Sequence, residues 1–350
     1  MNTEITAQAA REIEASLLVF FVSSATFANP AGPAAALVDA LAKNPFTLAG
    51  EEGFKGKPKQ NCMLRAPEGI AAKRLLLVGV GDGEPNRYRE AAMLAARQAK
   101  KARCESVALF MPTADAAKLA AGHEGFLRGE YEFKRYVTPK EDEEYEGVTD
   151  LFVATELGGA ADVIARSTSV SAGIRVARNL VNDPPGALVP DVLATRAESI
   201  AARNNLEHKI FREDELEMQG FNLIMAVGKG SDSPPRLIHL IYRPAGGEVK
   251  CKIAFVGKGV TFDTGGYNIK TGGHMYNMHC DMAGGAAVLG AAEAIGRIKP
   301  NGVEVHFIVP AAENSISGRA MRPNDIYRGY GKKTVEIGNT DAEGRLILAD

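Results

Sequence analysis

The sequence predicts an α/β fold divided between two domains. Short apolar runs of strand length alternate along the chain with segments of helical spacing, and this alternation is typical of strands packed against helices. A length of 350 residues suits two domains of roughly 150 residues each. Apolar residues make up 45% of the chain, which is enough for a sizeable core in each domain.

Residues 1–158 are expected to form an N-terminal α/β domain. Apolar runs predict strands at Leu17–Val22, Arg74–Val80 and Ser106–Met111. Helix-forming composition at helical spacing predicts helices at Arg89–Arg103 and Ala114–Arg128. The glycines of residues 78–83 lack the complete dinucleotide-binding fingerprint, so they indicate a tight turn after the second strand rather than a phosphate loop.

A linker helix is expected over residues 159–182. Before it, the acidic and polar segment Val137–Val148 is typical of an exposed loop. The helix itself is predicted from about Ala160 to Val181. Two prolines and a glycine within Asn182–Gly186 end it, because proline cannot continue a helix.

Residues 183–350 are expected to form the second domain, again with alternating elements. Its helix rich in glycine and alanine indicates close packing against a neighbour. Helices are predicted at Asp191–Asn204 and Asp281–Ile298, and strands at Lys209–Phe211, Leu237–Tyr242, Lys252–Val256 and Val303–Val309.

Charge and cysteine content argue against several classes of function. The 41 basic and 43 acidic residues nearly balance, so neither a nucleic acid nor an acidic membrane surface is an expected partner. The apolar run Leu17–Val22 is too short to span a bilayer, and Glu12 and Glu14 precede it where a signal peptide carries basic residues. The four cysteines are scattered, without zinc or disulfide spacing. We expect free thiols and a cytoplasmic location, with an organellar pool as an alternative.

Seven charged residues in the last hundred carry the chemical signal. A glycine-rich loop after the strand ending at Val256 contains two lysines and an aspartate, and a second aspartate opens the helix predicted from residue 281. Near residue 340 three charged residues lie two apart, so in an extended chain they would project to one side. These residues are Lys258, Asp263, Lys270, Asp281, Asp341, Glu343 and Arg345.

The four carboxylates of this set predict a metal site. Without cations they would repel one another, and two divalent ions would neutralise them. Paired metals are a common hydrolytic arrangement that activates a water and polarises a carbonyl. Oxygen-rich ligation accepts Zn, Mn, Mg or Co.

Each residue taken singly also has a structural interpretation. Asp263 could form a turn, and Asp281 could cap its helix. Asp341 to Arg345 could be a surface ion-pair ladder, and the lysines could be solvated. Their joint placement at strand ends and in loops favours a site, because α/β enzymes bind ligands beyond the carboxyl ends of strands.

These motifs resemble the M17 leucyl aminopeptidase family. The segments GKGVTFDTGG and NTDAEGRL carry the resemblance, and NTDAEGRL is the more specific. Further similarity covers the chain from about Glu124 onward, while the first 120 residues match weakly. It lies at Glu124–Tyr136, Asn179–Ala194, Ala226–Ile238 and Pro310–Asp325.

The resemblance implies a metal-dependent aminopeptidase that releases N-terminal residues, preferably leucine and other apolar ones, through a bridging metal-bound water. Lys258, Asp263, Asp281 and Glu343 would hold the more exchangeable metal, and Asp263, Asp341 and Glu343 the tighter one. Lys270 would stabilise the oxyanion, Arg345 would hold a bicarbonate as general base, Asn339 would bind the substrate, and Met278 would line the side-chain pocket. No histidine ligand is implied, so His274 and His279 are not expected to take part.

The resemblance also implies a catalytic domain with a mixed sheet between helical layers, a homohexamer, and peptide substrates. Members of the family continue past the motif around Arg345, so we expect the chain to be C-terminally truncated. Two other functions remain open from the residues alone: a two-metal phosphoesterase using the same carboxylates, and a non-enzymatic binding or regulatory protein that keeps the fold.

Overall fold

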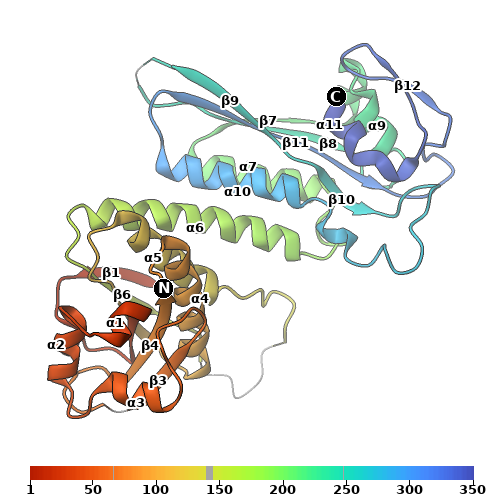
Figure 1. Ribbon diagram of the computed structural model, residues 1–350. Helices are drawn as coiled ribbons and strands as arrows, with labels where there is room; N and C mark the ends of the chain where they lie inside the picture. Colours follow the sequence, from red (N-terminus) through yellow and green to blue (C-terminus); the bar gives the residue numbers. More distant parts are fainter. Residues whose placement is uncertain (66, 139–144, 247) are drawn as a thin grey trace. The chain divides into compact units, whose positions relative to one another are not determined.

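The computed structural model describes residues 1–65, 67–138, 145–246 and 248–350 (Figure 1). The chain divides into two compact units, Met1–Ser171 and Ala172–Asp350. The division falls inside the long helix α6 (Ala160–Asn182), which matches the helix predicted at about Ala160–Val181. None of the helices described is both long and apolar enough to cross a membrane.

The first unit is built on a sheet of six strands in the order β1-β6-β5-β2-β4-β3. All neighbours in it are parallel except the edge strand β3, which runs antiparallel to β4. The strands are β1 (Asn2–Thr6), β2 (Leu17–Ser23), β3 (Asn61–Arg65), β4 (Arg74–Gly81), β5 (Ser106–Phe110) and β6 (Asp150–Ala154).

Helices cover both faces of this sheet. Alternate residues of β2 enter two separate cores, with Leu17 and Val19 in one and Leu18 and Phe20 in the other. A strand buried on both faces is therefore apolar throughout, which explains why β2 is recognised in the sequence. The helices are α1 (Ser24–Ala28), α2 (Pro33–Ala40), α3 (Pro45–Glu51), α4 (Pro85–Lys101) and α5 (Ala116–Glu130).

The sequence predicts the central elements of this unit but not its margins. The three predicted strands correspond to β2, β4 and β5, and the two predicted helices to α4 and α5. The turn predicted at residues 78–83 is present, with positive φ at Gly81 and Gly83. The edge strands β1 and β3, the strand β6 and the short helices α1 to α3 are not predicted. Of the predicted loop Val137–Val148, residues 139–144 lie outside the described residues, and the rest has no regular secondary structure.

The second unit has a mixed sheet organised around its longest strand, β11 (Val303–Asn314). β9 (Cys251–Val256) and β10 (Gly259–Asp263) both run parallel to β11, the first along its beginning and the second along its end. On the other edge β8 (Arg236–Tyr242) is antiparallel to β11, and β7 (Glu207–Phe211) is antiparallel to β8. A separate hairpin pairs β12 (Ile326–Arg328) with β13 (Thr334–Glu336).

Helices lie on both sides of this sheet as well. α7 (Pro190–Asn204) and α10 (Ala283–Ile298) pack on one face. Three shorter helices pack on part of the other: α8 (Glu213–Gln219), α9 (Asn222–Gly228) and α11 (Glu343–Ala349). The expected mixed sheet between helical layers is confirmed. α10 begins two residues later than predicted, and α8, α9, α11, β10 and the hairpin are not predicted.

Glycines allow α10 to contact the second half of α6 closely. A Cβ atom on Gly290 would lie 2.6 Å from Gly173 O, and one on Gly173 would lie 2.3 Å from Gly290 O. These separations are far below van der Waals contact, so the two backbones meet only because both residues lack a side chain. The predicted close packing of the Gly/Ala helix is therefore present.

Gly290→Val is expected to lower the free energy of unfolding by about 1–3 kcal/mol, because overpacking forces the backbones of α6 and α10 apart. Urea denaturation of the purified chain measures this change. Ala287→Val is the matched control, since Ala287 is exposed on the same helix. Equal stability of the two variants would contradict the close-packing interpretation.

Candidate metal centre

The first carboxylate of the site lies where β10 ends. Asp263 is in register with Asn314 at the end of β11, and parallel strands bring their carboxyl ends to one edge of the sheet. Asp263 is only 2% exposed. Its Oδ1 accepts hydrogen bonds from Gly265 N at 2.9 Å and from Asn314 Nδ2 at 2.8 Å. The carboxylate is thus held in place from two sides.

Two further carboxylates come from the 3-10 turn η3 (Thr340–Ala342) and the first residue of α11. The expectation of an extended chain here is wrong. The Asn339 side chain caps the turn by accepting a hydrogen bond from Asp341 N at 2.8 Å, and a helix follows directly. Residues two apart on a helix differ in direction by about 200°. Glu343 is therefore buried while Arg345 is exposed, so Arg345 does not project to the same side.

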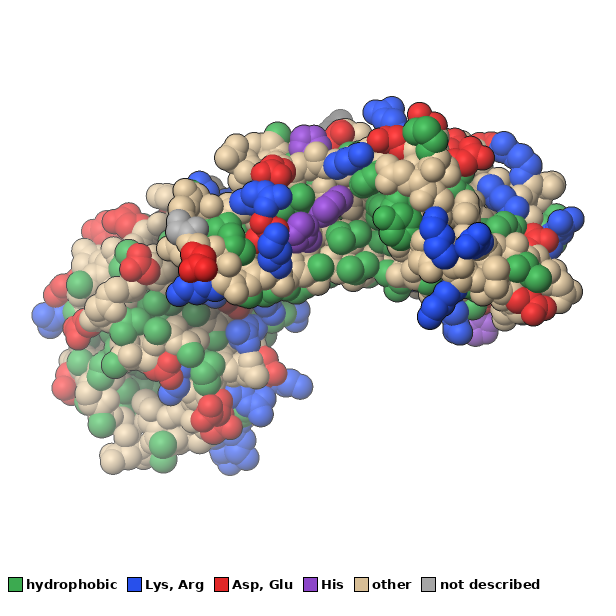
Figure 2. All heavy atoms as spheres, turned by 90° about the horizontal axis from the view of Figure 1, so that it is seen from above, with side chains coloured by type: hydrophobic (Ala, Val, Ile, Leu, Met, Phe, Trp, Pro, Cys, Tyr) green, Lys and Arg blue, Asp and Glu red, His purple; other side chains and the backbone are tan. Residues whose placement is uncertain are grey.

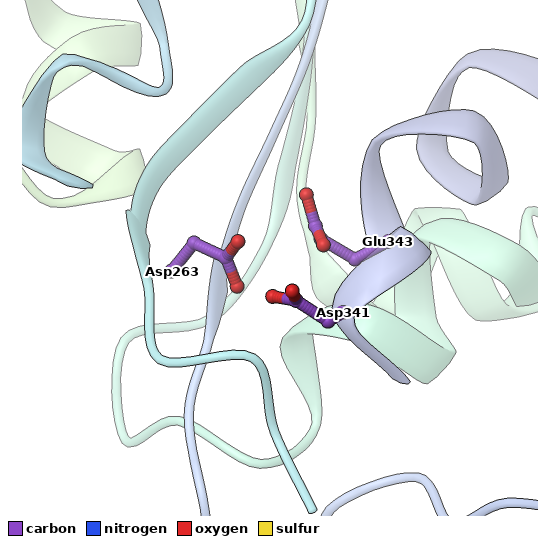
Figure 3. A group of neighbouring side chains, drawn as sticks. All are labelled: Asp263, Asp341 and Glu343. Atoms are coloured by element: carbon purple, nitrogen blue, oxygen red, sulfur yellow. The ribbon is translucent and has the colours of Figure 1, made fainter. Parts of the chain in front are cut away.

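Asp263, Asp341 and Glu343 point toward one another (Figure 3). Each offers one carboxylate oxygen, and these three oxygens lie within 4.8 Å of one another. Glu343 is 1% exposed, and Asp341 lies nearer the solvent. The structure therefore brings together three of the four carboxylates predicted from the sequence within the reach of one cation.

Two lysines provide positive charge at this cluster. Lys270 Nζ lies 2.8 Å from Asp263 Oδ2 and 2.5 Å from Asp341 Oδ1. Lys258 Nζ lies 2.7 Å from Glu343 Oε1 and 2.9 Å from Asp281 Oδ2. The fourth predicted carboxylate, Asp281, thus joins the site through Lys258.

Burial and charge act against each other in this cluster. Burial lowers the pKa of Lys270, but hydrogen bonding and attraction from Asp263 and Asp341 outweigh it, so the pKa rises overall and the ammonium is retained. The pKa of Lys258 also rises, because hydrogen bonding and attraction from Glu343 and Asp281 outweigh the lowering caused by burial. Burial raises the pKa of Glu343, the charge of Asp263 adds to this, and Lys258 offsets part of it.

A buried threonine joins the two loops that carry the carboxylates. Thr340 Oγ1 donates to Gly265 O at 2.6 Å and accepts from Asn268 N at 2.8 Å. Asn314 Nδ2 also donates to Thr340 O, at 3.1 Å. Thr340 and Asn314 are not among the site residues predicted from the sequence, although both lie inside the segments that carry the resemblance. Their place inside these motifs, close to the charged residues, was the available signal.

Glycines make room for Lys258. A Cβ atom on Gly344 would lie 2.8 Å from Lys258 Nζ, and one on Gly257 would lie 2.4 Å from Gly284 O. The start of α10 therefore approaches the β9–β10 connection closely, and Gly285 N donates to Lys258 O at 2.8 Å. Substitution of Gly344 would displace the lysine from Glu343.

The remaining predicted residues lie in the loops around the cluster. Asp281 does not cap α10, whose N-cap is Met282, because the short 3-10 helix η2 (Met278–Cys280) comes before it. Met278 is half-buried in η2, and Asn339 is exposed with its side chain engaged by the turn. His274 is exposed and His279 half-buried, and in the described residues the metal-spaced group contains neither.

The donor set fits divalent cations. Its three converging ligands are carboxylates, and hard cations such as Mg²⁺ and Mn²⁺ favour oxygen. Glu343 Oε2 is buried and has no hydrogen-bond partner among the described residues. A buried carboxylate oxygen without a donor is costly, and a cation at this position would satisfy it.

Family models match both units of the chain. The model described as the cytosol aminopeptidase family, catalytic domain, matches residues 175–350, and that of the N-terminal domain matches residues 18–140. The likeness thus extends further toward the N-terminus than the sequence motifs do.

Curated relatives and solved structures agree with these models. A probable cytosol aminopeptidase of Microcystis aeruginosa is 42% identical over 91% of this chain and 66% of its own length. Leucine aminopeptidase 1 of Arabidopsis thaliana is 41% identical over 87% of this chain and 60% of its own length. A mutant of tomato leucine aminopeptidase superposes with a TM-score of 0.88 at 32% identity, covering 100% of this chain and 70% of that one.

A second solved structure, the bottromycin maturation enzyme BotP in complex with Mn, has a TM-score of 0.81 at 28% identity, covering 96% of this chain and 68% of that one.

The chain spans less than two thirds of the length of the curated relatives named above. With both family models matched and the fold shared throughout, the chain belongs to the cytosol aminopeptidase family.

Proposed function

We propose that this chain is the core of a metal-dependent aminopeptidase that releases single residues, preferably leucine and other apolar ones, from peptide N-termini. The observation that carries the proposal is the convergence of Asp263, Asp341 and Glu343 at one edge of the sheet, with Lys258 and Lys270 ion-paired to them. Membership of the cytosol aminopeptidase family supports the same reaction.

Two divalent ions, Zn or Mn with Mg or Co as alternatives, would be held by five side chains. One would lie among Lys258, Asp263, Asp281 and Glu343, and the other among Asp263, Asp341 and Glu343. Lys258 would release its proton when the first of these ions binds, because an ammonium has no lone pair to offer a metal. When bound, such a pair polarises a carbonyl and acidifies a water. The Mn named for BotP supports a divalent metal in a protein of similar fold.

The cationic side chains would act on the developing charge. Lys270 lies beside Asp263 and Asp341, and its ammonium would donate to the oxyanion of the tetrahedral intermediate. Arg345 is exposed on α11 and would hold a bicarbonate as general base.

The loops around the cluster would select the substrate. Asn339 would orient the peptide while its side chain caps η3, and Met278 on η2 would line the pocket for the first side chain. We also propose that the protein is cytoplasmic and assembles as a homohexamer. The name cytosol aminopeptidase and the resemblance to the leucyl aminopeptidase family support this location and assembly. The chloroplastic relatives of Arabidopsis thaliana leave an organellar pool as an alternative.

Removal of divalent metal should abolish hydrolysis of a leucyl chromogenic amide, because the proposed metal pair would activate the water and polarise the carbonyl. Adding Mn²⁺ or Zn²⁺ back should restore it. A phosphate ester assayed in parallel tests the phosphoesterase alternative. Full amidase activity in a preparation shown to be metal-free would refute the proposal.

Lys270→Ala should lower kcat by about 10²–10³, since this is the typical loss on removing one oxyanion donor. KM should change less, because the interaction would form in the transition state. Steady-state kinetics measure both constants, metal content is measured on the same samples, and Lys333→Ala is the exposed control. A normal kcat in Lys270→Ala would show that the role is misassigned.

We propose that the free terminal amine of the substrate would bind one of the metals. N-acetyl-leucine amide should therefore not be hydrolysed under conditions where leucine amide is, because acetylation blocks this amine. Product formation is followed by chromatography. Equal rates for the two compounds would rule out exopeptidase action while leaving the metal site intact.

A further inference from the structure

The outer face of the second sheet carries a pair of histidines away from the carboxylate cluster. Side chains alternate along a strand, and Leu240 on β8 and Phe307 on β11 enter the core beneath α7 and α10. His239 and His306 therefore face the opposite side. Figure 2 shows neighbouring histidine side chains at the surface, among basic and acidic groups and beside a hydrophobic area.

The two imidazoles meet across an antiparallel strand pair. His239 is in register with Ile308 and His306 with Ile241, so the two histidines are diagonal neighbours on one face. His239 Nε2 lies 2.8 Å from His306 Nδ1, and the ring centroids are 5.1 Å apart. The His306 side chain is 24% exposed, so solvent reaches the pair.

A buried carboxylate fixes the orientation of one ring. Glu304 Oε1 lies 3.0 Å from His306 Nε2, and Glu304 is also ion-paired to Lys252 and Arg243. Hydrogen bonds from Lys252 and His306 lower the pKa of Glu304 to about 2, so it is a carboxylate and only accepts. His306 Nε2 must then carry the hydrogen, and in the neutral ring this leaves the Nδ1 lone pair facing His239.

We propose that His239 Nε2 and His306 Nδ1 form a binding site for a divalent transition-metal ion such as Ni²⁺, Cu²⁺ or Zn²⁺, with Glu304 as the positioning residue. A ring nitrogen that bonds a carboxylate while the other binds metal is the common arrangement of histidine ligands. Two nitrogens on one ion at bond lengths of about 2.0–2.1 Å lie about 2.9–3.3 Å apart. The two nitrogens need to separate by only a few tenths of an ångström, and both rings must turn so that their lone pairs converge on the ion.

Charge and protonation around the pair permit binding. Burial lowers the pKa of His239 and the nearby His306 lowers it further, so the neutral imidazole is favoured. On binding, the His239 proton moves from Nε2 to Nδ1 of the same ring, and the His306 proton stays on Nε2, hydrogen-bonded to Glu304. The surrounding basic groups each face an acid: Arg243 and Lys252 bond Glu304, and Arg243 also lies 2.9 Å from Glu207.

This site would differ in chemistry from the carboxylate cluster. Imidazole nitrogen suits Ni²⁺, Cu²⁺ and Zn²⁺, whereas carboxylate oxygen also accepts Mg²⁺. Excess Mg²⁺ therefore provides competition at the carboxylates but not at the histidines. Metal binding by the histidine pair does not depend on peptidase activity, and the experiment below measures metal binding alone.

The test is calorimetric titration of Ni²⁺ into the whole chain in excess Mg²⁺. One Ni²⁺ should bind per chain, and His239→Ala or His306→Ala should each abolish this binding. Glu304→Gln should weaken it about 10–100-fold, the usual cost of losing the partner that orients a ligand. His208→Ala, at an exposed position on the neighbouring β7, and Asp263→Asn, in the carboxylate cluster, should leave it unchanged. Circular dichroism confirms that each variant is folded.

A second measurement identifies the ligands directly. The electron paramagnetic resonance spectrum of added Cu²⁺ should show coupling to two imidazole nitrogens, and His306→Ala should remove this signature. The inference is wrong if the folded wild-type chain binds no Ni²⁺. It is also wrong if binding persists in His306→Ala and is lost instead in His274→Ala or His279→Ala, which would place the ion in the loop before α10.

Discussion

Compensation of buried negative charge is the constraint on which the second unit depends. Asp263 and Glu343 are almost fully buried within reach of one another, and a buried charge is costly unless it is paired. Lys258 and Lys270 bridge these carboxylates to Asp281 and Asp341, so the charges remain paired. Glycines at the β9–β10 connection and at the start of α11 allow this pairing, because a side chain at Gly344 would meet the Lys258 ammonium.

One strand connects the two sites considered above. The end of β11 places Asn314 against Asp263, while its beginning places Glu304 and His306 on the outer face. Because β8, β9 and β10 all pair with β11, its register sets the position of Lys258 between β9 and β10 as well as that of His239 on β8. A shift of one residue would move every side chain of β11 to the other face, so both arrangements depend on the same hydrogen bonds.

The sequence predicts those strands and helices whose burial leaves a clear apolar pattern. It misses the elements that are too short or too exposed to show one. β2 and β4 are apolar on both faces, and α4 presents a continuous alanine face to its neighbours, so pattern alone finds them. The edge strands and the helices of five to eight residues carry too few periods to be distinguished from loops. At the site, motif and composition predict the carboxylates and lysines, but Asn314 and Thr340 are found only through their hydrogen bonds.

The sequence by itself determined the residue types of the carboxylate cluster, the succession of central strands and helices, and the family that the motifs resemble. The tertiary structure decided how those residues meet. The cap at Asn339 makes the segment around Asp341 helical, which buries Glu343 and exposes Arg345, and η2 leaves Asp281 facing Lys258 rather than capping α10. The histidine pair likewise exists only through strand register. The reason is that residue types are local, whereas direction, burial and pairing depend on contacts between segments far apart in the chain.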